Sequence, residues 1–218
     1  LVQNWRIGFS DAHLPSTEEI QQALSLTDPN LLELNPEDHS VFLAKEGMKL
    51  DLGALAKGYI ADKIKDYLLS QGVTSALINL GGNVLTIGQN AVSQRAWRIG
   101  IQNPKQPRGN HSAILAVINQ SVVTSGIYER TLTVEGRNYH HILNRKTGYP
   151  IENQLASLTI VSDKSVDGEI WTTRLFGESP TSILSQIEQQ AGIEALIITQ
   201  DSQLFCSSGL LEQIIPAS

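Results

Sequence analysis

A succession of short apolar runs in the middle of the chain constrains its fold more than any other feature. Each run is rich in Val, Ile, Leu or Thr, and Gly, Asn or Pro separates it from the next, which is the pattern of strands joined by turns. The predicted strands are residues 97–101, 113–118, 121–124, 130–134 and 139–143. Because these strands cluster instead of alternating regularly with helices, an α+β fold is expected.

Helical patterns lie on both sides of this strand-rich region. Residues 54–71 carry an apolar stripe at helical spacing, and Gly72 is a natural stop. A further helix start is marked by Ser16 followed three residues later by Glu19, the spacing of a capping box. Two more helices are predicted at residues 167–176 and 180–190, and two more strands at residues 75–80 and 157–161. We therefore expect mostly antiparallel sheets with flanking helices.

Length and charge narrow the class of protein. The 218 residues carry 16 Lys and Arg against 22 Asp and Glu, a formal charge of 16 − 22 = −6, and binders of nucleic acid need basic surfaces instead. The chain has no run of the roughly 20 apolar residues that a spanning helix needs, and its single cysteine, Cys206, excludes an internal disulfide. Without repeats or linkers, one domain over residues 1–218 is expected.

The chain begins with Leu1, and its only methionine is Met48. Leu1 is not an initiator residue, so we expect a fragment or a processed product. Signal sequences and lipid-anchoring motifs lie at true N-termini, so their absence here carries little information about location.

The first candidate site is the segment 50–59, where an extended stretch turns at Gly53 into the predicted helix. Such a junction exposes backbone N–H groups and the positive end of the helix dipole, which suits a phosphate. Lys57, one turn into the helix, adds a cation. The alternative is that Asp51 caps the helix and that Lys57 is a solvated surface residue.

The second candidate is the pair Gly81 and Gly82, which follows the predicted strand 75–80. A double glycine there lets backbone approach a ligand closely, but it more often forms a hairpin turn. We therefore expect a hairpin whose second strand is residues 84–87.

The segment 139–150 is denser in functional side chains, with His140 and His141 followed by a turn rich in Lys, Thr and Gly. Neighbouring strand residues point to opposite faces, so one histidine at most faces a given site. A single imidazole fits a general base better than a metal pair. The alternative is one core or edge histidine and one surface histidine.

The last candidate is the predicted helix 167–176. Glu169 and Thr173 stand four residues apart, which places a carboxylate and a hydroxyl on one helix face. Both are oxygen donors that Mg²⁺ accepts, with Asp167 and Thr172 as auxiliaries. The alternative is that Asp167 caps the helix and the threonines are structural.

The chain has no Gly-x-Ser-x-Gly elbow, Walker loop, Cys-x-x-Cys or His-Glu-x-x-His motif, which disfavours the corresponding hydrolases, nucleotide loops and zinc sites. Taken in order, its segments resemble the ApbE family of flavin transferases. Four blocks carry the resemblance: residues 50–62, 79–82, 124–130 and 141–150. The flanking stretches are compatible with it, so it covers nearly all of the chain.

The resemblance implies an ApbE-like, T-fold-like α+β domain that uses Mg²⁺ and FAD. It implies contacts to FAD at Asp51, Lys57 and Leu143, with His141 as the base. The metal would lie where two helix starts meet. Its implied ligands are the carbonyl of Ala54 together with the helix residues Glu169, Thr172 and Thr173. A looser correspondence places Trp5, Arg6 and Ile7 near the flavin.

Two departures from the family pattern stand out. The family's helix motif is Asp-x-x-x-Thr, and aligning Asp167 with it puts Trp171 at the Thr position, whereas aligning Glu169 recovers Thr173. We prefer the second alignment because both oxygen donors then share one face. The second departure is that the N-terminal part of the family domain is missing.

The activity implied by the resemblance is transfer of FMN from FAD to a Thr or Ser hydroxyl of an acceptor flavoprotein, with release of AMP. The alternatives are an FAD pyrophosphatase that uses water at the same site, and a catalytically silent flavin-binding module. Related full-length bacterial proteins are exported and membrane-anchored lipoproteins, and a cytoplasmic member is equally compatible with this sequence. No nucleic-acid partner is expected, and the sequence leaves the oligomeric state open.

Overall fold

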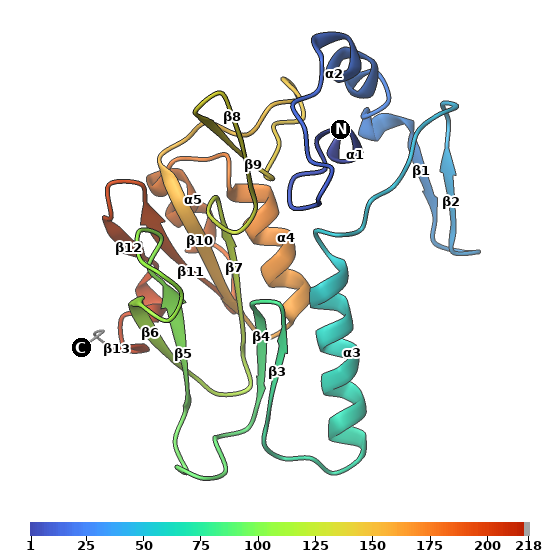
Figure 1. The fold of residues 1–218 in the computed structure, drawn as a ribbon. Coiled ribbons are helices and arrows are strands. Elements are labelled where there is room, and N and C mark those ends of the chain that lie inside the picture. Colours follow the sequence, from blue (N-terminus) through green and yellow to red (C-terminus); the bar gives the residue numbers. More distant parts are fainter. Residues whose placement is uncertain (216–218) are drawn as a thin grey trace. The chain divides into compact units, whose positions relative to one another are not determined.

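A six-stranded sheet forms the centre of the larger of two units in the computed structural model, which describes residues 1–215 (Figure 1). The smaller unit combines Leu1–Asp51 with Ile127–Glu152, and the larger unit combines Leu52–Gly126 with the chain from Asn153 onward. Each unit is therefore assembled from two separate stretches of sequence. Among the described residues, no helix is both long and apolar enough to cross a membrane.

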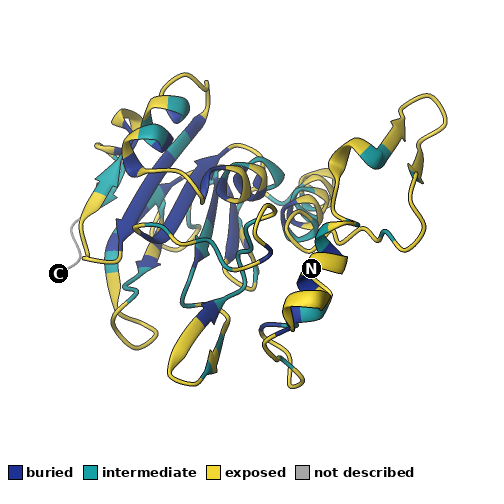
Figure 2. Ribbon diagram, turned by 90° about the horizontal axis from the view of Figure 1, so that it is seen from above, coloured by how far each residue is buried: buried dark blue, intermediate teal, exposed yellow. Residues whose placement is uncertain are grey.

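The six strands of the large sheet lie in the order β12-β11-β10-β7-β4-β3, and every neighbouring pair is antiparallel. The strands are β3 (Ala76–Leu80), β4 (Asn83–Ile87), β7 (Ser121–Gly126), β10 (Leu155–Ser162), β11 (Ile193–Thr199) and β12 (Leu204–Cys206). Every residue of β4 and of β10 is buried, and Figure 2 shows the central strands largely in dark blue. The sheet therefore has covered faces on both sides.

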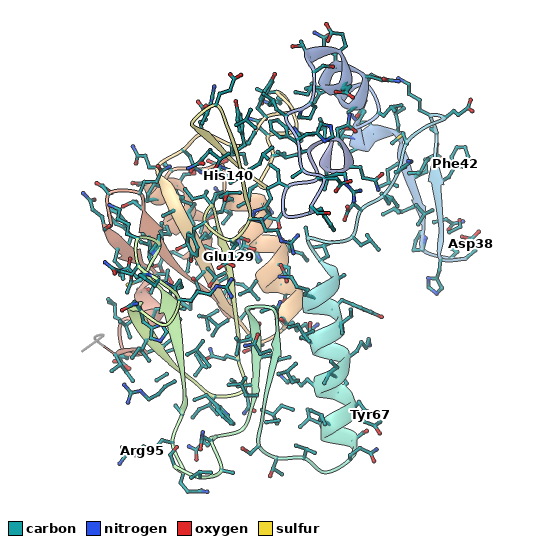
Figure 3. All side chains as sticks on the ribbon, viewed as in Figure 1. Asp38, Phe42, Tyr67, Arg95, Glu129 and His140 are labelled. Carbon is teal, nitrogen blue, oxygen red and sulfur yellow. The ribbon has the colours of Figure 1, made fainter. Side chains whose placement is uncertain are left out.

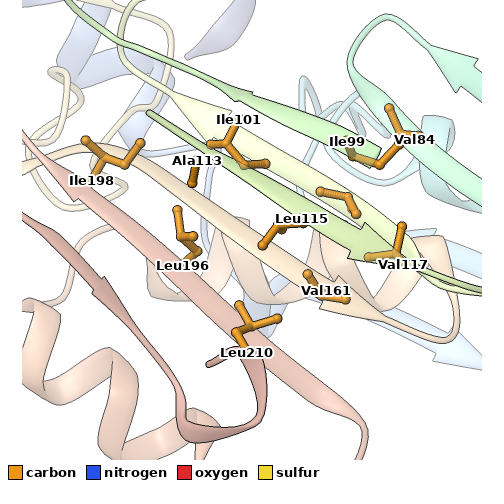
Figure 4. Close-up of a cluster of buried hydrophobic side chains, with 11 residues drawn as sticks. Val84, Ile99, Ile101, Ala113, Leu115, Val117, Val161, Leu196, Ile198 and Leu210 are labelled. Carbon is orange, nitrogen blue, oxygen red and sulfur yellow. The ribbon is translucent and has the colours of Figure 1, made fainter. Parts of the chain in front are cut away.

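A three-stranded sheet covers one face. It consists of β5 (Trp97–Gln102), β6 (His111–Val117) and β13 (Ile214–Ile215), in the order β13-β6-β5. Side chains of β5 and β6 meet side chains of the large sheet in one apolar core (Figure 4). The residues of this core are Val84, Ile99, Ile101, Ala113, Leu115, Val117, Val122, Val161, Leu196, Ile198 and Leu210.

Helices α3 (Ala56–Ser70) and α4 (Ser165–Leu175) cover the other face. Ala61 of α3 packs with Leu85 and Ile87 of β4, whereas Val84 belongs to the core between the sheets. This alternation follows from the two-residue period of a strand. Helix α5 (Pro180–Ile187) and the short 3₁₀ helix η2 (Ser208–Leu210) lie against β11.

The smaller unit has its own core around Trp5. It contains α1 (Val2–Trp5), α2 (Thr17–Leu24), the 3₁₀ helix η1 (Pro29–Leu31) and two hairpins. The hairpins are β1 (Leu32–Asn35) with β2 (Ser40–Leu43), and β8 (Thr131–Val134) with β9 (Arg137–His140). The buried residues of this core are Trp5, Ile7, Ile20 and Tyr139. Phe42 and Asp38 of the first hairpin are labelled in Figure 3, and Phe42 is exposed.

The α+β prediction with antiparallel sheets is confirmed, and so is the capping box, because Ser16 and Glu19 exchange both hydrogen bonds. The double glycine forms the expected hairpin turn between β3 and β4, with positive φ at Gly81 and Gly82. The predicted strand 139–143 was wrong in extent, because β9 runs from Arg137 to His140 and residues 141–143 lie outside it.

Candidate active site

The first turns of α3 and α4 approach each other closely at Gly58. A Cβ atom at this position would lie 2.6 Å from the carbonyl oxygen of Ser165 and 2.7 Å from the Cα of Val166. Both neighbours are backbone atoms, so they cannot swing away as a flexible side chain would. The absence of a side chain at Gly58 therefore permits this contact. The expected meeting of two helix starts is confirmed.

The N-terminus of α4 is capped from outside the helix. Its own N-cap residue, Lys164, makes no side-chain cap. Instead Asp62 of α3 accepts hydrogen bonds from the backbone N–H of Ser165 (2.7 Å) and of Val166 (3.0 Å). A carboxylate at this position satisfies two orphan donors and complements the helix dipole. The interpretation of Asp167 as the cap was therefore wrong.

Glu169 lies one turn further along α4 and is only 5% exposed. Its Oε1 accepts a hydrogen bond of 2.8 Å from the side-chain amide of Asn83, at the start of β4. The Nζ of Lys57 on α3 lies 3.6 Å from the same oxygen. A buried carboxylate needs such partners because burial alone disfavours its charged form. Three elements thus converge on one acidic group.

This geometry decides between the interpretations of the segment 50–59. Helix α3 begins at Ala56 with Leu55 at its N-cap and no side-chain cap, so Asp51 does not cap it. Lys57 is not a merely solvated residue either, since its side chain is 43% exposed and paired with Glu169. The alternative of a capping Asp51 with a free surface lysine was wrong.

The other predicted metal ligands differ in accessibility. Thr173 on α4 is exposed, and so is Ala54, which precedes α3. Thr172 is fully buried, and its hydroxyl donates a hydrogen bond of 3.2 Å to the backbone carbonyl of Glu169. All three lie in the same unit as Glu169.

The chemistry of this donor set fits a hard cation. A carboxylate, a threonine hydroxyl and a backbone carbonyl are oxygen ligands of the kind that Mg²⁺ accepts. Both contacts of the Glu169 carboxylate are made by Oε1. In the part of the chain that the structure describes, no three His, Cys, Asp or Glu residues form a metal-binding group, which disfavours a zinc site of several imidazoles or thiolates.

The ring nitrogens of the two adjacent histidines make different contacts. His140 accepts a hydrogen bond at Nδ1 from the backbone N–H of Ile142 (3.3 Å), so its Nε2–H donates to the carbonyl of Ile151 (2.9 Å). Burial lowers the pKa of His140. His141 places Nδ1 3.4 Å from the carbonyl of Arg130, and a carbonyl can only accept. The neutral ring of His141 therefore carries its lone pair on Nε2. The histidine pair divides into a structural residue and a candidate base.

The remaining predicted residues lie in the smaller unit. Trp5 is 1% exposed, donates from its indole N–H to the carbonyl of Gly148 (2.8 Å) and packs on Tyr139. It is thus a core residue, as is Ile7. Arg6 forms an ion pair with Asp11, Nε to Oδ2 at 2.6 Å, and this bond lowers the pKa of Asp11.

Leu143 packs against the same core and forms an isolated bridge with Pro150. Asp51, at the end of the first stretch of the smaller unit, is exposed. The flavin contacts predicted for Asp51, Leu143, Trp5, Arg6 and Ile7 stay predictions.

Sequence reasoning missed the side chains that hold the carboxylate in place. Asn83 directly follows the double glycine, and Asp62 lies within the predicted helix 54–71. Each contacts α4 across more than 80 residues of sequence, 86 for Asn83 to Glu169 and 103 for Asp62 to Ser165. No local pattern carries that information.

Comparison with known proteins agrees with the resemblance of the four blocks. The sequence model of the ApbE family matches residues 1–197. The chain is 44% identical to an FAD:protein FMN transferase of Klebsiella pneumoniae over 208 residues, 95% of this chain and 64% of that protein. It is 34% identical to a protein of the same name from Treponema pallidum over 225 residues, 98% of this chain and 62% of that protein.

The fold agrees as well. The crystal structure of the ApbE protein from Thermotoga maritima matches with a TM-score of 0.82 and 28% identity, covering 93% of this chain and 65% of that one. The chain thus spans less than two thirds of the length of each of these three proteins.

Proposed function

We propose, since this chain belongs to the ApbE family, that it forms the greater part of an FAD:protein FMN transferase. One observation supports the proposal above the others: the buried carboxylate of Glu169, held by Lys57 and Asn83 where two helix starts meet. It occurs in a chain that is 44% identical to a protein of that name. The chain has a formal net charge of −6. An anionic diphosphate therefore needs a localised positive charge, such as a cation held by this carboxylate.

In the proposed reaction a Thr or Ser hydroxyl of the acceptor protein attacks the FMN-side phosphorus of FAD. A bond forms between the hydroxyl oxygen and that phosphorus. The bond from the phosphorus to the bridging oxygen breaks, and AMP leaves with the bridging oxygen and the electron pair. The hydroxyl proton passes to a base. Phosphoryl transfer of this kind depends mainly on positioning and charge neutralisation.

We assign the base to His141. Its Nδ1–H donates to the carbonyl of Arg130, which orients the ring and leaves Nε2 as the proton acceptor. A general base contributes a factor of about 10² to 10⁴ to the rate. We retain Asp51 and Leu143 as FAD contacts, with Trp5, Arg6 and Ile7 nearer the flavin.

For the cation we assign Glu169, Thr173 and the backbone carbonyl of Ala54 as ligands. Bound Mg²⁺ supplies charge neutralisation at the diphosphate. Lys57 adds a positive charge beside the same carboxylate. Thr172 contributes indirectly, because its hydroxyl holds the backbone carbonyl of Glu169 within the helix.

The test is covalent flavin transfer. The protein is mixed with FAD, Mg²⁺ and candidate acceptor proteins from the same organism, and flavin fluorescence is followed on a denaturing gel. We expect a fluorescent acceptor band and release of AMP. Absence of label with every acceptor contradicts the proposal, and release of FMN and AMP at a rate independent of acceptor indicates hydrolysis instead.

The role of His141 is tested in the same assay. His141→Ala should reduce labelling by about 10² to 10⁴-fold while FAD binding is retained. His140→Gln is the matched control, since it removes the neighbouring imidazole, whose two ring nitrogens are engaged by backbone groups. Labelling by His141→Ala at the wild-type rate would exclude His141 as the base.

We also propose, from membership of the family, that the full-length protein is exported and anchored by lipid. Fractionation of cells after labelling with a radioactive fatty acid tests this. Labelled protein in the membrane fraction is the expected result, and unlabelled protein in the cytoplasm contradicts it.

A further inference from the structure

A row of buried polar side chains lies behind Glu169. Asn83, Ser121 and Ser165 are the first residues of β4, β7 and α4, and their exposures are 1%, 0% and 0%. Ser121 Oγ lies 3.0 Å from Ser165 Oγ, and Ser165 Oγ lies 2.6 Å from Asn83 Oδ1. Asn83 Nδ2 then lies 2.8 Å from Glu169 Oε1. Four side chains from three elements therefore form one continuous hydrogen-bonded row.

The direction of each hydrogen bond in the row follows from the number of protons. An ionised carboxylate only accepts, so Asn83 presents its NH₂ group to Glu169 and its oxygen to Ser165. Ser165 must donate to that oxygen, which uses its single proton. In its contact with Ser165, Ser121 is then the donor, and the same hydroxyl also lies 3.3 Å from the backbone carbonyl of Val84. The row is directed toward the carboxylate, and it fixes which way the Asn83 amide faces.

The same geometry distinguishes the two oxygens of the carboxylate. Asn83 Nδ2 and Lys57 Nζ both converge on Oε1. Lys57 is partly exposed and has a long, flexible stem, whereas Asn83 is buried and held from behind. The rigid contact is therefore the one from Asn83, and neither contact uses Oε2.

We propose that Asn83 is a positioning residue that fixes Glu169 through Oε1, so that Oε2 is presented to the divalent cation. Ser165 and Ser121 act by holding the Asn83 amide in the required orientation. This inference rests on the proposed function, since it concerns the cation of that site. Groups that orient a metal ligand in this way typically change metal affinity 10- to 100-fold when they are removed.

The test uses Mn²⁺ as a spectroscopic probe, with binding to the protein–FAD complex measured by electron paramagnetic resonance. Asn83→Leu keeps an approximate side-chain volume and removes the amide. We expect its Mn²⁺ affinity to fall 10- to 100-fold. Ser165→Ala, which deletes a single oxygen and leaves Asn83 in place, should weaken Mn²⁺ binding in the same direction and by a smaller factor.

The control for a purely structural effect is Thr86→Val. Thr86 lies on the same strand as Asn83, is fully buried, and exchanges hydrogen bonds with the backbone of Gln120. Its replacement should lower the melting temperature without changing Mn²⁺ affinity. If Asn83→Leu and Ser165→Ala lose stability as Thr86→Val does and still bind Mn²⁺ like the wild type, Asn83 has only a structural role and the inference is overturned.

Ser165→Ala keeps the test decisive if Asn83→Leu does not fold, because unchanged Mn²⁺ affinity in a folded Ser165→Ala protein also overturns the inference. A wild-type protein that binds no Mn²⁺ in the presence of FAD overturns it as well. Loss of Mn²⁺ affinity in the variants supports the inference even where the wild type transfers no FMN, so the two proposals fail separately.

Discussion

His140 and His141 show how far two adjacent, identical side chains can differ. The ring of His140 is half-buried, and both of its nitrogens are engaged by backbone groups of residues 142 and 151. The ring of His141 places its Nδ1 3.4 Å from the carbonyl of Arg130. The sequence predicted that one histidine faces a site, and the reason given was strand alternation. That reason does not apply, because His141 lies beyond the end of β9, and a site faced by one histidine stays a prediction.

The lowered pKa of His140 predicts a pH dependence of stability. Burial lowers this pKa from its ordinary value of 6.5, so the unfolded chain takes up a proton at a pH where the folded protein does not. The contribution of His140 is therefore complete above about pH 6.5 and is lost as the pH falls through the folded-state pKa. Urea denaturation of the wild type should show a decreasing free energy of unfolding over that window.

The matched variants assign this effect to one residue. His140→Gln should flatten the decline on the acid side, whereas His13→Gln, which changes an exposed histidine, should leave it as in the wild type. Equal slopes for His140→Gln and the wild type would mean that His140 does not contribute.

Helix α4 depends on its neighbour α3 for its N-terminal cap. Asp62→Ala removes the acceptor for two backbone N–H groups and should lower the free energy of unfolding by about 1–2 kcal/mol, in the range of capping residues. Asp66→Ala on the same helix, which breaks only an exposed pair with Lys63, is the control and should change stability by less than about 0.5 kcal/mol. Chemical denaturation measures both, and equal effects would show that Asp62 does not act as a cap.

The close approach of α3 to α4 predicts whether replacing Gly58 by alanine stabilises or destabilises the protein. In an isolated helix Gly→Ala stabilises by about 1 kcal/mol. Gly58→Ala should instead destabilise the protein, because the new Cβ would meet backbone atoms of Ser165 and Val166. Thermal unfolding of this variant decides the point, and a raised melting temperature would show that the two helices can separate without cost.

The elements themselves were largely predictable, and their mutual contacts were not. Residues 54–71 and 113–118 have clear periodicity, and the structure places α3 and β6 there. The cap on α4 and the partners of Glu169 come from residues that no local pattern connects to it. Propensity and periodicity act over a few residues, whereas the site is assembled by tertiary packing.

Across the whole molecule, we expect backbone amides in buried strands to be protected from hydrogen exchange more strongly than amides in exposed strands. All eight residues of β10 are buried in the centre of the large sheet. The hairpin β1–β2 of the smaller unit has no buried residue. Local openings concentrate where few apolar contacts are made.

Hydrogen exchange followed by mass spectrometry should therefore find the slowest amides in β10 and fast amides in residues 32–43. Tyr67, labelled in Figure 3 toward the end of α3, is exposed, and we expect the amides of this segment to exchange at an intermediate rate. Protection of the β1–β2 hairpin equal to that of β10 would contradict this ordering.

The row from Ser121 to Glu169 has a consequence for how the site comes into being. Three of its members begin different elements, and the residues joined by each of its hydrogen bonds lie 44 to 86 residues apart along the chain. A carboxylate held in this way acquires its surroundings only when β4, β7 and α4 have all docked. Completion of the tertiary structure and creation of this carboxylate site are then a single event.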